Sequence, residues 1–164
     1  FFALLSKDWE EAALQARQYG VRVLICRLGI VLGTRGGALG KMIPLFKMGL
    51  GSPLGTGEQW FSWIHEHDLV RIYLFLLGQK DLEGPVNCTA PGPVKNREFT
   101  KALGEALKRP TFMPAVPSFM LKIIKGEFAN VLLKGQRVVP KKLSDAGFDF
   151  QFPRLNDDVL YLLV

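Results

Sequence analysis

The chain has 164 residues, of which 48% are hydrophobic and 22% charged, with two cysteines. This apolar fraction excludes a disordered chain, and the length suffices to bury a sizeable core. Two cysteines cannot form a disulfide framework. Because Cys26 and Cys88 lie in apolar runs, we expect both to be reduced and buried, as in a cytoplasmic protein. The most apolar stretch, 69–77, is too short to span a bilayer, so we expect no membrane association.

The net charge of +6 raises the question of nucleic-acid binding. Eleven Lys and Arg residues stand against three Glu residues between positions 90 and 142, a local excess of eight positive charges. These cations are spread singly, and no stacking aromatics are interleaved with them. The pattern is typical of a charged, soluble surface, so a nucleic-acid partner is not favoured.

The first part of the chain alternates between helical and strand patterns. In chain order we predict a helix over 4–19 ended by Gly20, a strand over 21–32, a glycine-rich turn over 33–40 leading into a helix that ends near Met48, a strand over 59–64, and a largely buried helix over 68–77. The strand over 21–32 is apolar on both faces, as central strands of parallel sheets are.

The second part continues this pattern and then changes. We predict a strand over 84–89, a helix capped by Asn96, short elements over 117–125, 128–133 and 140–146, and a last helix after Pro153. The buried face of the helix after Asn96 is predicted to consist of Phe99, Ala102, Leu103, Ala106 and Leu107. The predicted fold class is α/β, with βα units around a mainly parallel sheet in residues 1–109 and a smaller appended lobe in residues 110–164.

Common catalytic motifs are not matched. With Gly33 first, the glycine-rich turn has Arg35 and Ala38 where a dinucleotide loop needs glycines. His65 and His67 form an H-x-H pair, but neither cysteine stands at metal-ligand spacing, so we expect no metal site.

Several spaced motifs nevertheless resemble one family. These are R-L-G-I-V-L-G over 27–33, W-I-H-E-H-D-L-V over 63–70, P-V-N-C-T-A-P over 85–91, N-R-E-F over 96–99, G-Q-R-V-V-P over 135–140 and A-G-F over 146–148. Together they are similar to the extended short-chain dehydrogenases/reductases. The closest resemblance is to the epimerase-like members labelled nucleoside-diphosphate-sugar epimerase or cell-division-inhibitor-like protein.

The resemblance implies a Rossmann-like sheet, an NADP or NAD cofactor, and a small-molecule carbonyl or sugar-type ligand. Members of the family begin with a strand and a glycine-rich loop, for which this sequence has no match. The chain does not begin with Met, so we expect it to be the C-terminal portion of a longer protein, whose N-terminal half is its first partner. Whether the protein forms a homo-oligomer stays open.

Departures from the family bear on activity. The family's Tyr-x-x-x-Lys pair aligns with Leu5 and Trp9, neither of which can transfer a proton. Positions that hold nucleotide phosphates in sugar-nucleotide members align with Ile30 and Phe61, which offer no hydrogen-bond donor. The resemblance therefore supports ancestry better than a sugar-nucleotide epimerase activity.

Candidate site residues follow from the resemblance and from the rule that ligands bind at the carboxyl edge of parallel strands. Leu28, Gly29 and Ile30 are predicted to face the cofactor, and Arg27, Trp63 and His65 to line a substrate cleft, although core packing is an equal alternative for each. His65 is the weak candidate for a catalytic acid or base, because it alone can titrate near neutrality. Two functions stay open, an NAD(P)-dependent reductase or epimerase and a non-catalytic dinucleotide-binding regulator linked to cell division.

Overall fold

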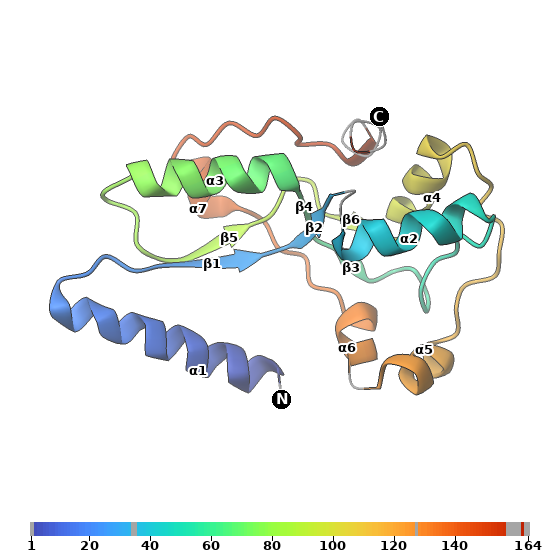
Figure 1. Cartoon of the computed structure of the whole chain (residues 1–164), viewed down its shortest axis with the longest axis horizontal. Coiled ribbons are helices and arrows are strands. Elements are labelled where there is room, and N and C mark those ends of the chain that lie inside the picture. The colour runs from blue at the N-terminus through green and yellow to red at the C-terminus, as the bar shows by residue number, and fades with distance from the viewer. Residues whose placement is uncertain (1, 34–35, 127, 157–161, 163–164) are drawn as a thin grey trace.

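The computed structural model describes residues 2–33, 36–126, 128–156 and 162. Its elements, in chain order, are α1 (Phe2–Leu14), η1 (Gln15–Tyr19), β1 (Leu24–Leu28), β2 (Ile30–Leu32), α2 (Gly37–Lys47), β3 (Trp60–Phe61), β4 (Trp63–His65), α3 (Glu66–Gly78), β5 (Gly84–Cys88), β6 (Val94–Lys95), α4 (Asn96–Ala106), α5 (Ser118–Lys125), α6 (Phe128–Leu133) and α7 (Lys141–Asp145) (Figure 1). None of the helices in the described ranges is long and apolar enough to cross a membrane.

Two parallel strand pairs confirm the predicted α/β class. β1 pairs with β5 and β2 with β4, both parallel, while the short β3 and β6 pair antiparallel. Parallel strands need crossover connections, and the β1 to β5 crossover carries α2 and α3. Figure 1 shows α3 and α1 on opposite sides of β1 and β5.

The single strand predicted over 21–32 is wrong, because Gly29 divides it. The Gly29 N–H donates to the Cys88 carbonyl at 3.1 Å, whereas the next N–H, of Ile30, donates to the Ser62 carbonyl at 2.8 Å. The chain therefore changes partner from β5 to β4 within one residue. A Cβ at position 29 would lie 2.9 Å from both the Ser62 carbonyl oxygen and the Thr89 methyl, so only glycine fits this crossing.

The strand predicted over 59–64 is also interrupted, at Ser62. Its hydroxyl donates to the Gln136 carbonyl at 2.6 Å and accepts the Val138 N–H at 3.0 Å. The segment between α6 and α7 is thereby fastened across the gap between β3 and β4. Position 135 has to be glycine for this approach, since a Cβ there would overlap the Trp60 backbone.

The helix predicted over 68–77 exists as α3, but it is not largely buried as expected. Ile72 and Leu76 face the strands and are buried, whereas Val70, Leu74 and Leu77 are exposed, Leu74 to 66%. Helices bury an apolar stripe only where a second layer covers it, and no described element covers this stripe. α3 therefore carries an uncovered apolar face.

α1 is held mainly by one ion pair. The Arg27 guanidinium on β1 donates to both carboxylate oxygens of Glu10, at 2.7 and 2.6 Å. The helix predicted over 4–19 ends as an α-helix at Leu14 and continues as a 3-10 turn, and Gly20 closes it in the left-handed conformation (φ 74°) as expected. Trp9 of α1 is exposed, so the apolar face of this helix is uncovered too.

A second arginine caps α3. Arg22 donates to the carbonyls of Leu76, Gln79 and Leu82 at 3.2, 2.9 and 3.0 Å. Helix C-termini present unsatisfied carbonyls and a partial negative charge, so a guanidinium is well matched there. This contact sets the position of α3 along β1.

α4 begins differently from the prediction. Asn96 lies inside the helix and is buried, and its Oδ1 accepts the Leu54 N–H at 2.8 Å. The Lys95 backbone N–H instead donates to the Glu98 carboxylate at 2.7 Å. Asn96 was predicted as the cap because Asn is a common residue at helix N-termini. Its side chain instead accepts a hydrogen bond from Leu54, which is 42 residues away in the sequence. The predicted inner face, including Phe99 and Leu103, is buried.

The C-terminal segment is anchored by the buried Asp68 carboxylate. It accepts the Gln151 N–H at 3.1 Å, the Phe152 N–H at 2.9 Å and the Arg71 guanidinium at 2.9 Å. Arg71 also donates to the Asp149 carbonyl at 2.8 Å. One carboxylate of α3 thus holds the segment that leads to the last predicted helix, most of which lies outside the described residues.

The division at residue 109 stays a prediction. Residues beyond it contact the first part closely, as where the Val116 carbonyl accepts the Gly55 N–H and the Val116 N–H donates to the Pro53 carbonyl, both at 2.9 Å.

We predict that Asp68→Asn destabilises the protein by about 3 kcal/mol. The substitution removes the negative charge beside Arg71, and its amide NH2 group, which cannot accept a hydrogen bond, faces either the Phe152 N–H or the Gln151 N–H in a buried site. The measurement is urea denaturation. Asp81→Asn, at an exposed position, is the matched control and should change stability by less than about 0.5 kcal/mol. Equal effects of both variants would contradict the anchoring role.

Candidate functional site at the strand carboxyl edge

The carboxyl end of the β1–β5 strand pair meets the amino end of the β2–β4 pair. Leu28 ends β1, Gly29 makes the crossing, and Ile30 begins β2. Leu28 is 51% exposed, an unusual state for a large apolar residue at the end of a strand, whereas Ile30 is half-buried. In parallel α/β sheets this edge is where ligands bind. The three residues predicted to face a cofactor are thus together at such an edge.

Thr89 adds a polar group that sequence analysis did not single out. It directly follows β5, its methyl group faces Gly29, and the side chain is buried. Its hydroxyl has no hydrogen-bond partner within the described part of the chain. Buried hydroxyls are normally paired, so this one offers a donor and acceptor to a group at the edge. No local sequence signal distinguishes it from an ordinary strand Thr.

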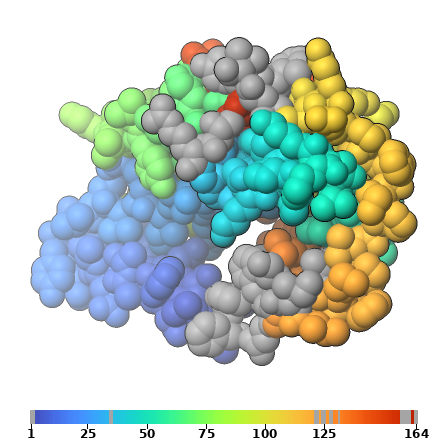
Figure 2. All heavy atoms as spheres, turned by 45° about the vertical axis from the view of Figure 1, so that its right-hand side comes forward, coloured from blue at the N-terminus to red at the C-terminus, as the bar shows by residue number. Residues whose placement is uncertain are grey.

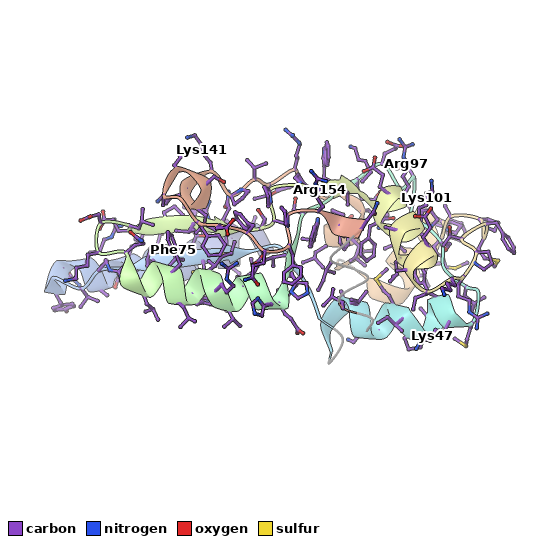
Figure 3. The ribbon with its side chains drawn as sticks, turned by 90° about the horizontal axis from the view of Figure 1, so that it is seen from above. Lys47, Phe75, Arg97, Lys101, Lys141 and Arg154 are labelled. Carbon is purple, nitrogen blue, oxygen red and sulfur yellow. The ribbon has the colours of Figure 1, made fainter. Side chains whose placement is uncertain are left out.

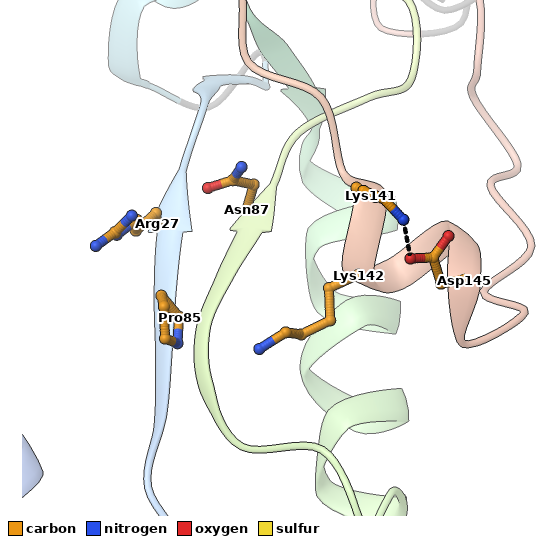
Figure 4. Close-up of a pocket in the computed structure, with 6 residues that line it drawn as sticks. All are labelled: Arg27, Pro85, Asn87, Lys141, Lys142 and Asp145. Carbon is orange, nitrogen blue, oxygen red and sulfur yellow. Dashed lines mark hydrogen bonds and ion pairs between the residues drawn. The ribbon is translucent and has the colours of Figure 1, made fainter.

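Arg27 was predicted to line a substrate cleft. It lines a cavity on the face of β1 and β5 that also carries Pro85 and Asn87. This cavity of about 320 Å³ is bounded by Arg27, Pro85, Asn87, Lys141, Lys142 and Asp145 (Figure 4). Each cation in it has a partner: Arg27 binds Glu10, Lys141 binds Asp145 at 2.6 Å, and Lys142 donates to the Glu83 carbonyl at 2.8 Å. The Glu10 carboxylate raises the pKa of Arg27, and Arg27 lowers that of Glu10. Arg27 is therefore committed to holding α1.

Trp63 lies in the core with no exposed surface, and its indole N–H donates to the Gly92 carbonyl at 3.0 Å. This placement favours the packing alternative over a place on a cleft wall. Phe61, on the neighbouring strand, is also buried and stacks on Phe99 with 4.1 Å between ring centroids.

His65 is buried at the start of α3. Its Nδ1 accepts the His67 N–H at 3.0 Å, and its ring stacks on Phe152 with 3.9 Å between centroids. Burial, opposed in part by the Asp68 carboxylate, lowers the pKa of His65 to about 4. The ring is therefore neutral at pH 7 and caps the helix. A catalytic role for it stays a prediction that these contacts do not support.

The cationic residues are spread over the surface. Lys47, Lys141 and the neighbouring pair of Arg97 and Lys101 project from three different helices (Figure 3). Several are paired with acids, as Arg97 is with Glu58 and Lys101 with Glu105. The one aromatic with two cations is Trp60, which has the Lys95 ammonium 3.9 Å and the Arg137 guanidinium 5.3 Å from its ring centroid within the described residues.

Two further hollows are present. A cavity of about 460 Å³ lies between β6 and the C-terminal segment, bounded by Gly92, Pro93, Val94, Glu98, Pro153, Arg154, Leu155 and Asn156. The face turned forward in Figure 2 is also hollowed, below α2 and above the region of α5. Among the described residues there is no group of three metal-ligating side chains.

Family comparisons agree with this architecture. The model of the NAD dependent epimerase/dehydratase family matches residues 8–88, and a model described as a domain of unknown function (DUF1731) matches residues 116–157. The chain belongs to the NAD-dependent epimerase/dehydratase family. The first match covers β1 through β5, including Leu28, Gly29 and Ile30, and ends one residue before Thr89.

Individual relatives are considerably longer than this chain. It is 45% identical over 157 residues to the Arabidopsis thaliana epimerase family protein SDR39U1 homolog, chloroplastic, covering 96% of this chain and 45% of that one. Among solved structures, human SDR39U1 with NADPH is 38% identical with a TM-score of 0.83, covering 87% of this chain and 48% of the human one. A nucleoside-diphosphate sugar epimerase from Corynebacterium glutamicum is 30% identical with a TM-score of 0.78, covering 99% and 31%. The chain spans about half the length of the curated relatives it matches.

We predict that the protein loses stability in acid through His65. Because its folded pKa of about 4 lies below the ordinary value of 6.5, the stabilising contribution is complete above pH 6.5 and is lost as the pH falls toward 4. Between about pH 7.5 and pH 5 this amounts to about 2 kcal/mol. Denaturation at both pH values measures it.

His65→Asn keeps an acceptor for the His67 N–H but cannot be protonated, so its stability should change less over this interval. His67→Gln, at an exposed position, is the control and should keep most of the wild-type pH dependence, because His67 is the smallest of the three causes that set the pKa of His65. If His65→Asn loses as much stability between about pH 7.5 and pH 5 as wild type does, protonation of the buried His65 is not the cause of the loss.

Proposed function

We propose that this chain supplies the substrate-binding half of an NAD(P)-dependent epimerase/dehydratase-type protein, and that its β1 carboxyl edge contacts the nicotinamide end of a bound NADP or NAD. The observation that carries the proposal is the exposed Leu28 beside the Gly29 crossing at this edge. The human relative's structure contains NADPH, which supports the same cofactor class here.

The residues at the edge fit such a group. Leu28 and Ile30 offer apolar surface for a planar ring, and Gly29 has no side chain that would hold a ligand away from the backbone. The Thr89 hydroxyl, which has no hydrogen-bond partner within the described residues, can hydrogen-bond a polar substituent. A bound nicotinamide supplies hydride transfer. The residues of this chain would position the ring and keep water from one side of it.

The substrate in this proposal is a small carbonyl or sugar-type molecule in the hollow between α2 and the region of α5 (Figure 2). A diphosphate group is not favoured, because Phe61 is committed to its stack on Phe99 and Ile30 is apolar. Leu5 and Trp9 cannot transfer protons, and His65 is neutral and packed. A protein that binds NADP or NAD without turnover is the second candidate, separated from the first by single-turnover assays on carbonyl compounds.

We also propose that an upstream segment of the same protein covers the apolar face of α3. Relatives are about twice as long, and β1 pairs on one side only within the described residues. Val70, Leu74 and Leu77 would then be core residues of the complete fold. A cytoplasmic location is likewise a proposal, since one relative is chloroplastic by name, and a homo-oligomer stays open.

The cofactor proposal predicts that Leu28→Asp in the full-length protein weakens NADPH binding at least about tenfold, because a carboxylate at the edge repels the phosphates and cannot pack on the ring. Nicotinamide fluorescence titration with NADPH and NADH measures this. Leu50→Asp is the matched control, as Leu50 is exposed to 50% on the loop after α2, and it should bind like wild type. No binding of either cofactor by wild type would refute the proposed function, and unchanged binding by Leu28→Asp would refute this edge as the contact.

The assembly proposal predicts that Leu74→Glu destabilises the full-length protein by about 2–3 kcal/mol, although the side chain is exposed in this chain, because the charge would be buried against the upstream segment. Denaturation of the full-length variants measures it. Leu45→Glu, on the exposed side of α2, should change stability by less than about 0.5 kcal/mol. A neutral Leu74→Glu would mean that the face stays open to solvent.

A further inference from the structure

The cavity beside Arg27 is enclosed by two walls that come from different parts of the chain. In the register of β1 and β5, Arg27 is opposite Asn87, so both side chains share one face with Pro85. The other wall is α7, which packs against β5 and contributes Lys141, Lys142 and Asp145. Figure 4 shows Arg27 extending from β1 on one side and Lys142 reaching toward β5 from the other. The volume of about 320 Å³ lies within the range of small-molecule sites.

Positive charge prevails in this cavity. Three of its lining residues are cationic and one, Asp145, is acidic. Asp145 pairs with Lys141 at 2.6 Å across one turn of α7, so these two charges offset each other. The charges of Arg27 and Lys142 remain, one on each wall. Because charges of one sign around a cavity attract ligands of the opposite sign, this cavity favours an anionic ligand.

Glu10 engages one edge of the Arg27 guanidinium. Its carboxylate accepts hydrogen bonds from Nε and Nη2, at 2.7 and 2.6 Å. A guanidinium carries five N–H groups, so the remaining donors on Nη1 and Nη2 are not used by this contact. Phosphate groups are well matched to such parallel donors. Arg27 can therefore keep α1 in place while its second edge binds an anion.

The Lys142 ammonium is held over β5 by a neutral group. It donates to the Glu83 backbone carbonyl at 2.8 Å, while the Glu83 carboxylate pairs with Arg17 at 3.5 Å. An ammonium has three N–H donors, of which this contact uses one. Asn87 adds a neutral donor, because its amide gives one N–H to the Val139 carbonyl at 3.2 Å and has a second. The donors are thus oriented by the protein and still have N–H groups to offer.

We propose that this cavity binds a small molecule with two phosphate groups, of the class of diphosphates and bisphosphates. Arg27 on β1 holds one phosphate, Lys142 on α7 holds the other, and the Asn87 amide is a further donor. Two phosphates match two cations on opposite walls, whereas a single phosphate engages one wall at a time. A bound ligand of this kind bridges β1 and α7 and so stabilises their packing.

This cavity is separate from the proposed cofactor contact. Leu28 directly follows Arg27, but neighbouring side chains of a strand point to opposite faces. A ring that packs on Leu28 therefore leaves the cavity open. Binding of a diphosphate here requires neither NADP nor NAD. Failure of cofactor binding would leave the inference intact, and failure of diphosphate binding would leave the proposed function intact.

The test is calorimetric titration of the full-length protein with inorganic pyrophosphate, at an ionic strength held constant with potassium chloride. We expect saturable binding with a Kd below about 1 mM. Inorganic phosphate should bind at least about tenfold more weakly, because it engages one wall only. The pyrophosphate site should persist when NADPH is present at saturation, since the two ligands occupy different faces of β1.

Three variants locate the site. Lys142→Gln removes one cation but keeps an amide donor, and it should weaken pyrophosphate binding at least about tenfold. Asp145→Asn removes the acid from the cavity and should strengthen binding about threefold. Lys101→Gln makes the same charge change on α4, next to Glu105, and as the matched control it should bind like wild type. Thermal unfolding near the wild-type temperature checks that each variant is folded.

Opposite effects of the Lys142 and Asp145 variants are expected only of this cavity, because attraction to the whole surface would respond to Lys101→Gln as well. Displacement of pyrophosphate by NADPH would place the anion at the cofactor contact and overturn the inference. Equal affinities of Lys142→Gln and Lys101→Gln, weaker binding by Asp145→Asn, or no saturable binding by wild type would each overturn it too.

Discussion

The Asp68 carboxylate is the contact on which the arrangement of this chain depends. It has no exposed surface and accepts hydrogen bonds from Arg71 and from the N–H groups of Gln151 and Phe152. A buried carboxylate is costly unless its lone pairs are satisfied, so the C-terminal segment has to occupy this place for α3 to bury Asp68 at all. Through that requirement Phe152 stacks on His65, and the Phe148 ring contacts both Phe150 and Phe75 of α3.

Gly29 imposes a second constraint, on the site itself. The space between the Ser62 carbonyl and the Thr89 methyl admits no side chain. Because residue 29 is a glycine, the chain can pass through this space and change its hydrogen-bonding partner from β5 to β4 in one step. That step turns Leu28 outward at the carboxyl edge while Ile30 turns inward. The Asp68 contact holds the start of α3 and hence the end of β4, against which β2 pairs. The two constraints therefore act at the two ends of β2: Gly29 precedes Ile30, and Asp68 follows His65, which pairs with Leu32.

Sequence patterns predicted what depends on neighbouring residues. The span of β5, the inner face of α4 and the Gly20 cap agree with the structure, because periodicity and glycine conformation are local properties. The break at Gly29, the roles of Asn96 and Asp68, and the open face of α3 were not predicted. Each depends on a partner that is distant in the sequence, from Ser62 for the break at Gly29 to Phe152 for Asp68, or on one outside the described chain. Of the candidate site, the edge residues were located by family resemblance, whereas the Thr89 hydroxyl carried no signal.

The match to the family and the side chains that differ from its pattern concern different parts of the structure. The residues that match the family model include both parallel strand pairs and the glycine crossing. The departures expected from the family resemblance concern Phe61, which packs on Phe99, and Leu5 and Trp9, which the resemblance aligns with the acid/base pair. A dinucleotide is recognised largely through backbone shape, whereas proton transfer and phosphate binding need particular side chains. Selection for cofactor binding can therefore persist while the reaction changes, and the altered positions mark where a different substrate would be recognised.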